Sequence, residues 1–78
     1  MPKDTVTDAY LMGIQEAREI KRELEANGID LNASQIEHLI ATEKELCALF
    51  AGTELAGLYR GSRDFWKLQL KKLNSKGA

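Results

Sequence analysis

The segment N-G-I-D-L-N-A-S-Q-I, residues 27–36, contains the signals for ending one helix and starting another. Gly28 favours a helix end, because glycine adopts the left-handed conformation there without strain. Asn32 and Gln35 have the spacing of a capping box, in which each side chain bonds the other residue's backbone amide. Leu31 and Ile36 have the spacing of a hydrophobic staple. So short a link between two helices predicts that they fold back antiparallel.

Apolar residues recur at helical spacing on both sides of this link. We expect a first helix from about Thr5 to Asn27, with an apolar stripe made of Val6, Tyr10, Gly13, Ile14, Ala17, Ile20 and Leu24. A second helix should start after Asn32 and stop at Gly52, with a stripe of Ile36, Leu39, Ile40, Leu46, Cys47 and Phe50. Gly13 lies within the first stripe, and we expect a second-helix surface at Leu46 and Cys47 to approach it closely.

The pattern after Gly52 predicts two further helical pieces. Residues 53–61 are interpreted as one or two helical turns that Gly61 ends, and Ser62 then caps a last helix to about Leu73. The predicted fold class is therefore all-α: an antiparallel helical hairpin, a short helical turn and a C-terminal basic amphipathic helix. One domain should cover residues 1–78, with 1–4 and 74–78 frayed.

The last helix carries the only tryptophan, Trp66, beside several cations. Its apolar contacts span about 200° of the helix, which predicts contact with two surfaces. Three interpretations remain open: Phe65 and Trp66 close the core, they anchor a protein interface, or the cations Arg60, Arg63, Lys67 and Lys71 bind phosphates of a nucleic acid. Leu11 and Met12 point away from the first stripe and form a possible second contact surface. The candidate partner-binding residues are Arg63, Phe65, Trp66, Lys67, Leu68, Leu70, Lys71, Leu11 and Met12.

Size and charge favour self-association. A lone core in a chain below roughly 80 residues rarely supplies more than about 3–5 kcal/mol, and a single cysteine allows no internal disulfide. Residues 1–59 hold five basic and eleven acidic side chains, a net charge of −6, whereas residues 60–78 hold six basic and one acidic, a net charge of +5. The basic end should lie against something acidic, and the acidic body of a second copy would serve. We therefore expect a homodimer.

Two charged residues fall inside the apolar stripes, Lys21 in the first helix and Glu43 in the second. A charge buried alone costs several kcal/mol. In an antiparallel hairpin the two side chains can meet, so we predict a structural Lys21–Glu43 pair. Glu43 could instead be a ligand or acid–base group in a pocket, or pair across a dimer seam.

The chemistry of catalysis and metal binding is sparse. His38 is the only histidine and is expected on the surface, and Cys47 lies in an apolar stripe, where a thiol acts as a small hydrophobe. No phosphate-binding loop is present. We expect no catalytic residues, no cofactor and no metal, and hence no enzyme. No stretch has the roughly 20 apolar residues of a membrane span, which predicts a cytoplasmic protein without membrane contact.

The ending G-S-R-D-F-W-K-L-Q-L-K-K-L, residues 61–73, on a small helical chain resembles short helical proteins encoded by phages and prophages. Such proteins often bind and block a host protein, anti-CRISPR proteins being one example. The resemblance implies a protein-binding module that modulates or inhibits a host protein, and it assigns no residues. The alternatives from other classes are a small nucleic-acid-binding regulator that uses the C-terminal helix and a subunit whose only task is assembly.

Overall fold

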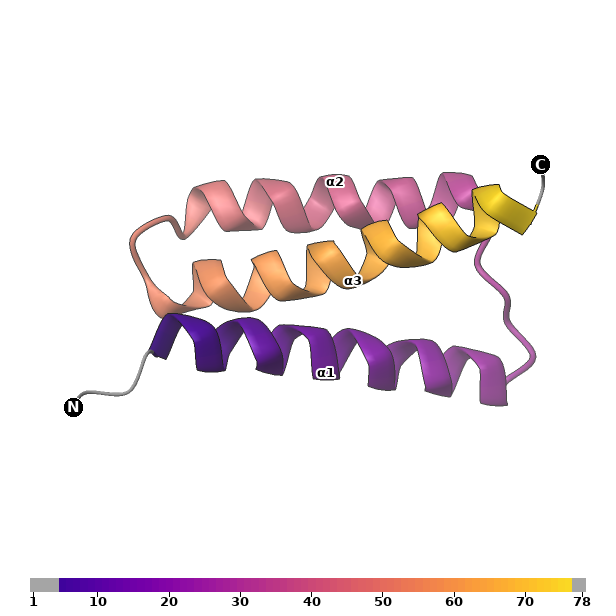
Figure 1. Ribbon diagram of the computed structural model, residues 1–78, viewed down its shortest axis with the longest axis horizontal. Coiled ribbons are helices and arrows are strands. Elements are labelled where there is room, and N and C mark those ends of the chain that lie inside the picture. Colours follow the sequence, from indigo (N-terminus) through magenta and orange to yellow (C-terminus); the bar gives the residue numbers. More distant parts are fainter. Residues whose placement is uncertain (1–4, 77–78) are drawn as a thin grey trace.

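The computed structural model describes residues 5–76 of the chain, and they form three helices (Figure 1). Helix α1 spans Thr5–Ala26, α2 spans Ala33–Leu49 and α3 spans Glu54–Lys76. No strand occurs within these residues, so the all-α prediction is confirmed. Residues 74–76, which lie in the segment expected to fray, are helical here; residues 1–4, 77 and 78 lie outside the described residues.

The link between α1 and α2 forms as the sequence predicts. Gly28 has φ 74°, and the amides of Gly28 and Ile29 donate to the carbonyls of Glu25 and Leu24, which is the Schellman ending. Asn32 Oδ1 accepts from the amide of Gln35 at 2.8 Å, and Gln35 Oε1 accepts from the amide of Asn32 at 2.9 Å. These local bonds define where α1 ends and where α2 begins.

The three helices are arranged differently from the predicted hairpin. The chain runs along α1, returns along α2 and runs forward again along α3 (Figure 1). Within residues 5–76, α1 and α2 make no close backbone contact with each other; both pack on α3. The prediction that the last helix touches two surfaces is therefore confirmed, and the prediction that the first two helices pack directly is wrong. Helix α3 lies between them, and its buried Phe65 and Trp66 pack with Ala17 of α1 and Ile36 of α2.

Two glycines bring α1 and α3 together. A Cβ on Gly13 would overlap the backbone carbonyl of Leu58, and one on Gly61 would overlap the backbone carbonyl of Tyr10. We call this contact the glycine crossing. Gly61 thus allows the two backbones to approach and does not end a helix, so the predicted break at Gly61 and cap at Ser62 are wrong and α3 is continuous. Gly13 likewise faces α3, not Leu46 and Cys47 of α2.

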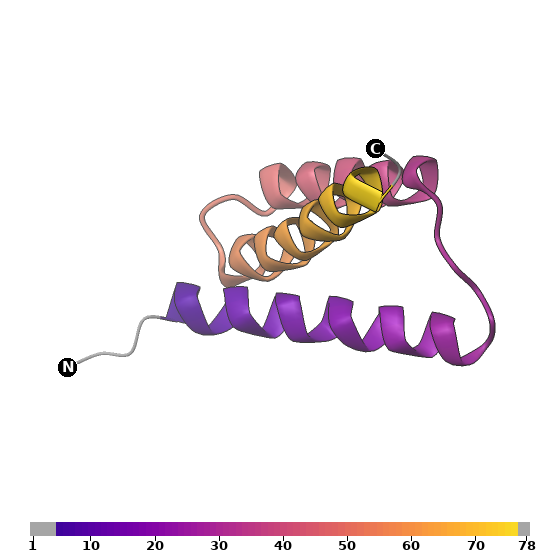
Figure 2. The same cartoon turned by 45° about the vertical axis from the view of Figure 1, so that its right-hand side comes forward.

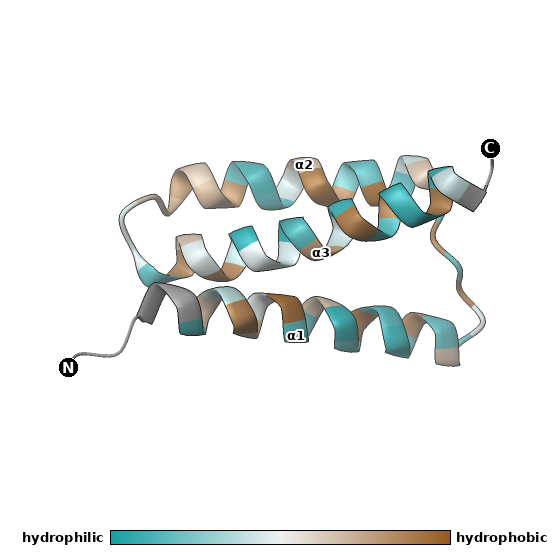
Figure 3. Ribbon diagram, viewed as in Figure 1, coloured by the Kyte–Doolittle hydropathy of each residue, from teal (hydrophilic) through white to brown (hydrophobic). Residues whose placement is uncertain are grey.

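The buried core is small and centres on the aromatic pair of α3. Trp66 is 2% exposed and Phe65 is 9% exposed, and their rings meet edge to face with centroids 5.1 Å apart. They pack with Ala17 of α1 and Ile36 of α2, surrounded by half-buried Ile14, Leu31, Leu39, Ile40 and Leu70. The interpretation in which Phe65 and Trp66 close the core therefore agrees with their burial. Toward the C-terminal end of α3, hydrophobic and hydrophilic bands alternate along the ribbon (Figure 3).

Candidate functional site

An open groove lies between the C-terminal halves of α1 and α3, closed at one end by the link to α2. It has a volume of about 760 Å³. We call it the C-terminal groove. Its apolar lining consists of Leu24, Ile29, Leu31, Ile36, Trp66, Leu68 and Leu73, and its charged lining of Lys21, Glu25, Asp30, Lys71 and Lys72.

The groove opens because α1 and α3 diverge beyond the glycine crossing (Figure 2). Ala17 is fully buried, whereas Ile20, less than one helical turn further along the same stripe, is 51% exposed. On the opposite wall Leu68 is 50% exposed, and Ile29 and Leu73 are also exposed. The apolar stripe of α1 therefore continues past the last part of α3 that covers it. Leu24 of that stripe lines the groove opposite Leu68 and Leu73, whereas Ile20 does not line it.

The charged lining does not contain the predicted Lys21–Glu43 pair. Lys21 Nζ donates to Glu25 Oε2 of its own helix at 2.6 Å. That prediction is wrong because it required α1 to pack on α2, and α3 separates them. An exposed pair at i,i+4 contributes only about 0.3–0.5 kcal/mol, so Lys21 and Glu25 remain available for other contacts.

Glu43 instead lies among the helices without a cation. Its Oε2 is buried and has no hydrogen-bond partner. Burial raises the pKa of Glu43, a hydrogen bond from Ser62 of α3 lowers it, and the charge of Glu16 raises it further, with a net increase. Glu43 is therefore a partly buried carboxylate with one unpaired oxygen, and it does not line the C-terminal groove.

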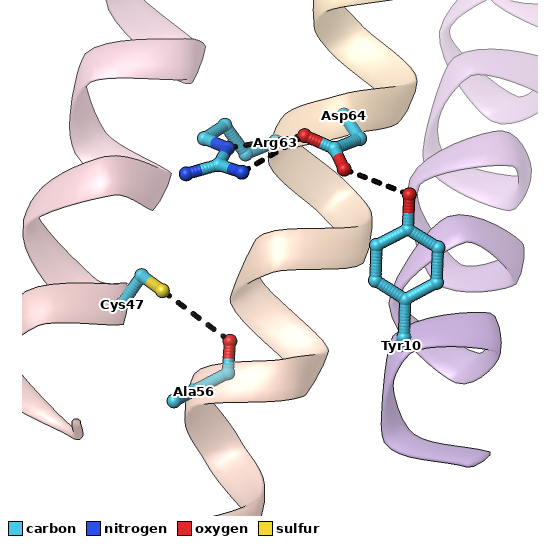
Figure 4. A network of polar contacts seen from close by, with 5 residues as sticks. All are labelled: Tyr10, Cys47, Ala56, Arg63 and Asp64. Atoms are coloured by element: carbon cyan, nitrogen blue, oxygen red, sulfur yellow. Dashed lines mark hydrogen bonds and ion pairs between the residues drawn. The ribbon is translucent and has the colours of Figure 1, made fainter. Parts of the chain in front are cut away.

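A polar network joins α1 to α3 beside the glycine crossing (Figure 4). The Tyr10 hydroxyl donates to Asp64 Oδ2 at 2.7 Å, and Arg63 donates to Asp64 Oδ1 through Nε at 3.1 Å and Nη2 at 3.0 Å. Burial alone would raise the pKa of Asp64, but these hydrogen bonds outweigh it and the pKa lies below its usual 3.8. The bond to Asp64, with burial, raises the pKa of Tyr10. The network fixes the register of the crossing.

This network was not predicted from the sequence. Its only signal was the position of Tyr10 within the first stripe, where a buried hydroxyl needs a partner. Asp64 gave no signal, because a break expected at Gly61 left the rotation of the last helix undefined. Cys47, expected as a small hydrophobe, is half-buried and its Sγ donates to the carbonyl of Ala56 at 3.5 Å. His38 is exposed, as expected.

The predicted partner-binding residues divide into three groups. Phe65 and Trp66 are buried in the core, with Leu70 half-buried against it, so they offer no free anchors in this chain. Leu68 and Lys71 line the C-terminal groove. The rest are Arg63, held by Asp64, the exposed Lys67, and Leu11 and Met12, which are exposed on α1 and do not line this groove.

A row of cations follows the exposed side of α3. Arg60, Lys67 and Lys71 are all exposed, and their spacing of seven and four residues puts them on one face of the continuous helix. Lys67 and Lys71 also border a shallower hollow between α2 and α3, with Glu37 and Ile40 on its other side. We call Arg60, Lys67 and Lys71 the basic row.

Comparisons with protein-family models, with curated proteins and with solved structures found no match for this chain. Within the described residues, no group of three or more His, Cys, Asp or Glu side chains is placed to hold a metal ion. Searching the same residues for a helix able to cross a membrane also found none. The features that bear on function are therefore the C-terminal groove and the basic row.

Proposed function

We propose that this protein is a small non-enzymatic protein-binding module whose C-terminal groove receives an apolar segment of another polypeptide. The observation that carries the proposal is the pair of facing apolar walls, with Ile29, Leu68 and Leu73 exposed above a floor that includes Trp66. A few polar groups around an apolar concavity are the usual composition of a binding site. The charged lining would orient the bound segment.

Burial of the exposed apolar residues alone would not supply the binding free energy of a micromolar complex. Burying the uncovered half of one such side chain contributes about 1 kcal/mol, so the three together contribute about 3 kcal/mol. A micromolar complex needs about 8 kcal/mol. The bound segment must therefore also contact the charged lining and cover neighbouring residues such as Leu24, as an amphipathic helix would.

The resemblance to short phage-encoded helical proteins supports a host protein as the partner, and the module would act on it in the cytoplasm. A modulator or inhibitor of this kind acts by occupying a surface that the host protein needs for another contact.

The experiment is affinity capture with three forms of the full chain. Leu68→Lys places a charge in the groove at a half-exposed position, so the fold should survive. Leu49→Lys is the matched control, because Leu49 is 74% exposed at the other end of the bundle. A partner retained by the wild type and the control but lost with Leu68→Lys supports the proposal. A partner retained by all three forms contradicts it.

The basic row supports a second candidate function, a small nucleic-acid-binding regulator. Phosphate contacts by Arg60, Lys67 and Lys71 would make affinity fall steeply with salt, with a slope of about −0.9 per phosphate neutralised on duplex DNA. Labelled duplex and single-stranded DNA and RNA would be titrated against the wild type and against Arg60→Glu/Lys67→Glu. Nucleic-acid binding that weakens as salt rises, is lost in Arg60→Glu/Lys67→Glu and is unchanged in Leu68→Lys would favour this function over the first.

A further inference from the structure

The two edges of the C-terminal groove carry opposite charge. The α3 edge has Lys71 and Lys72, and the opposite edge, formed by α1 and the link to α2, has Glu25 and Asp30. Lys21 also lies on that second edge, where it is already paired with Glu25. A segment bound along the groove would therefore meet a cationic side and an anionic side.

This charge pattern is self-complementary. In a twofold dimer the same surface of each copy contacts the other. If the axis runs along the groove, the α3 edge of one copy faces the α1 edge of its partner. Lys71 and Lys72 then face the partner's Glu25 and Asp30, and the same contacts repeat on the other side of the axis. If both edges carried the same charge, the two copies would repel each other in this arrangement.

The same surface leaves large apolar side chains uncovered. Exposed Ile29, Leu68 and Leu73 lie on the surface that the twofold contact would bury.

We propose that the occupant of the C-terminal groove is the α3 edge of a second copy of this chain, in a twofold dimer held by Leu68, Leu73 and the Lys71/Lys72 contacts to the partner's Glu25 and Asp30. This inference rests on the proposed function, since it names the polypeptide that the groove binds. The C-terminal halves of α1 and α3 from two copies would then enclose one shared apolar layer, which completes the small core of each chain.

The test is a charge exchange read by sedimentation equilibrium. In a dimer of the Lys71→Glu/Lys72→Glu variant, acidic side chains face acidic side chains at both contacts. In a dimer of the Glu25→Lys/Asp30→Lys variant, basic side chains face basic side chains at both contacts. Each variant alone should dimerise about a hundredfold more weakly than the wild type. An equimolar mixture should recover a dimer containing one copy of each, because all four edges are then complementary.

Arg60→Glu/Lys67→Glu is the matched control, with the same change of charge on the same helix outside the groove, and it should dimerise like the wild type. Circular dichroism checks that each variant stays helical. The inference is overturned by a wild type that is monomeric at micromolar concentration, by exchange variants that still dimerise, or by a mixture that stays monomeric. If the dimer fails these tests but a foreign protein is still captured by the wild type and lost with Leu68→Lys, the proposed function survives without self-association. Assemblies larger than a dimer that the charge-exchange variants do not weaken would instead favour a subunit whose only task is assembly.

Discussion

Helices α1 and α3 lie in close contact in their N-terminal halves and separate in their C-terminal halves. In the N-terminal halves, Gly13 and Gly61 let the backbones touch and the Tyr10–Asp64 bond fixes their register. In the C-terminal halves the helices diverge, and Ile20 and Leu68 are half exposed. Small residues close the first region, and large uncovered residues line the second.

The difference teaches that helical periodicity does not show where a stripe is covered. The apolar stripe of α1 extends from Tyr10 to Leu24, with Lys21 inside it, yet α3 covers only its first part. A close crossing acts as a fixed point, and two straight helices that leave it at an angle must separate. In this bundle the separation produces the C-terminal groove, which has an apolar floor and two charged edges.

Removing the aromatic centre should have the largest effect. Trp66→Ala deletes a side chain that is 2% exposed, and such deletions cost about 3–5 kcal/mol, comparable to the whole stability expected for so small a core. Urea denaturation followed by circular dichroism should find this variant largely unfolded. Leu68→Ala, half exposed in the other region, should cost less than about 1 kcal/mol. Equal losses in the two variants would contradict the contrast.

The glycine crossing should be sensitive to a single methyl group. Gly61→Ala places a Cβ onto the Tyr10 carbonyl, and overpacking of this kind costs about 1–3 kcal/mol. At an uncrowded helical site the same substitution stabilises by about 1 kcal/mol. A lower unfolding free energy for Gly61→Ala than for the wild type would agree with a close contact of the α1 and α3 backbones. A higher one would show that these backbones do not touch.

The polar network should contribute less. Tyr10→Phe removes the hydrogen bond to Asp64, at a cost of about 1 kcal/mol. Because the folded-state pKa of Asp64 is lowered, its ionised form stabilises the fold above pH 3.8, and that contribution is lost as the pH falls through the lowered value. The difference in unfolding free energy between wild type and Tyr10→Phe should shrink in acid. A difference that grows in acid would contradict this account of the network.

Glu43 should give the smallest effect, with the opposite sign. Glu43→Gln removes a partly buried charge and should stabilise the protein at neutral pH by at most about 1 kcal/mol, the low end of the range for an unpaired buried group. Because the folded-state pKa of Glu43 is raised above 4.5, protonation favours the fold: the wild type should approach the variant in stability as the pH falls toward 4.5. Glu45→Gln, at an exposed site of the same helix, should show neither change.

Local signals in the sequence were sufficient for the link but not for the arrangement of the helices. Gly28, Asn32 and Gln35 act through neighbouring backbone groups, so their spacing determined the bonds that form. Gly61 has two possible meanings, a helix end or a close approach, and only its contact with Tyr10 separates them. The Lys21–Glu43 prediction failed for the same reason, because a charge pair between helices depends on which helices touch.

The candidate site was only partly visible in the sequence. Leu68 fell outside the apolar face of the predicted last helix, and that exception marks one wall of the groove. Leu24, which lines the groove on the α1 side, gave no such sign, because it continues a regular stripe and its covering depends on where α3 diverges. Glu25 and Asp30 looked like ordinary surface charges until the fold placed them opposite Lys71 and Lys72.

The most direct test of the contrast is a series of ¹H–¹⁵N correlation spectra of the wild type recorded over increasing protein concentration. Self-association through the C-terminal groove predicts concentration-dependent shifts at Ile29, Leu68, Lys72 and Leu73, with Tyr10, Gly13 and Gly61 unchanged. Shifts centred on the glycine crossing, or spectra that do not change with concentration, would contradict the account.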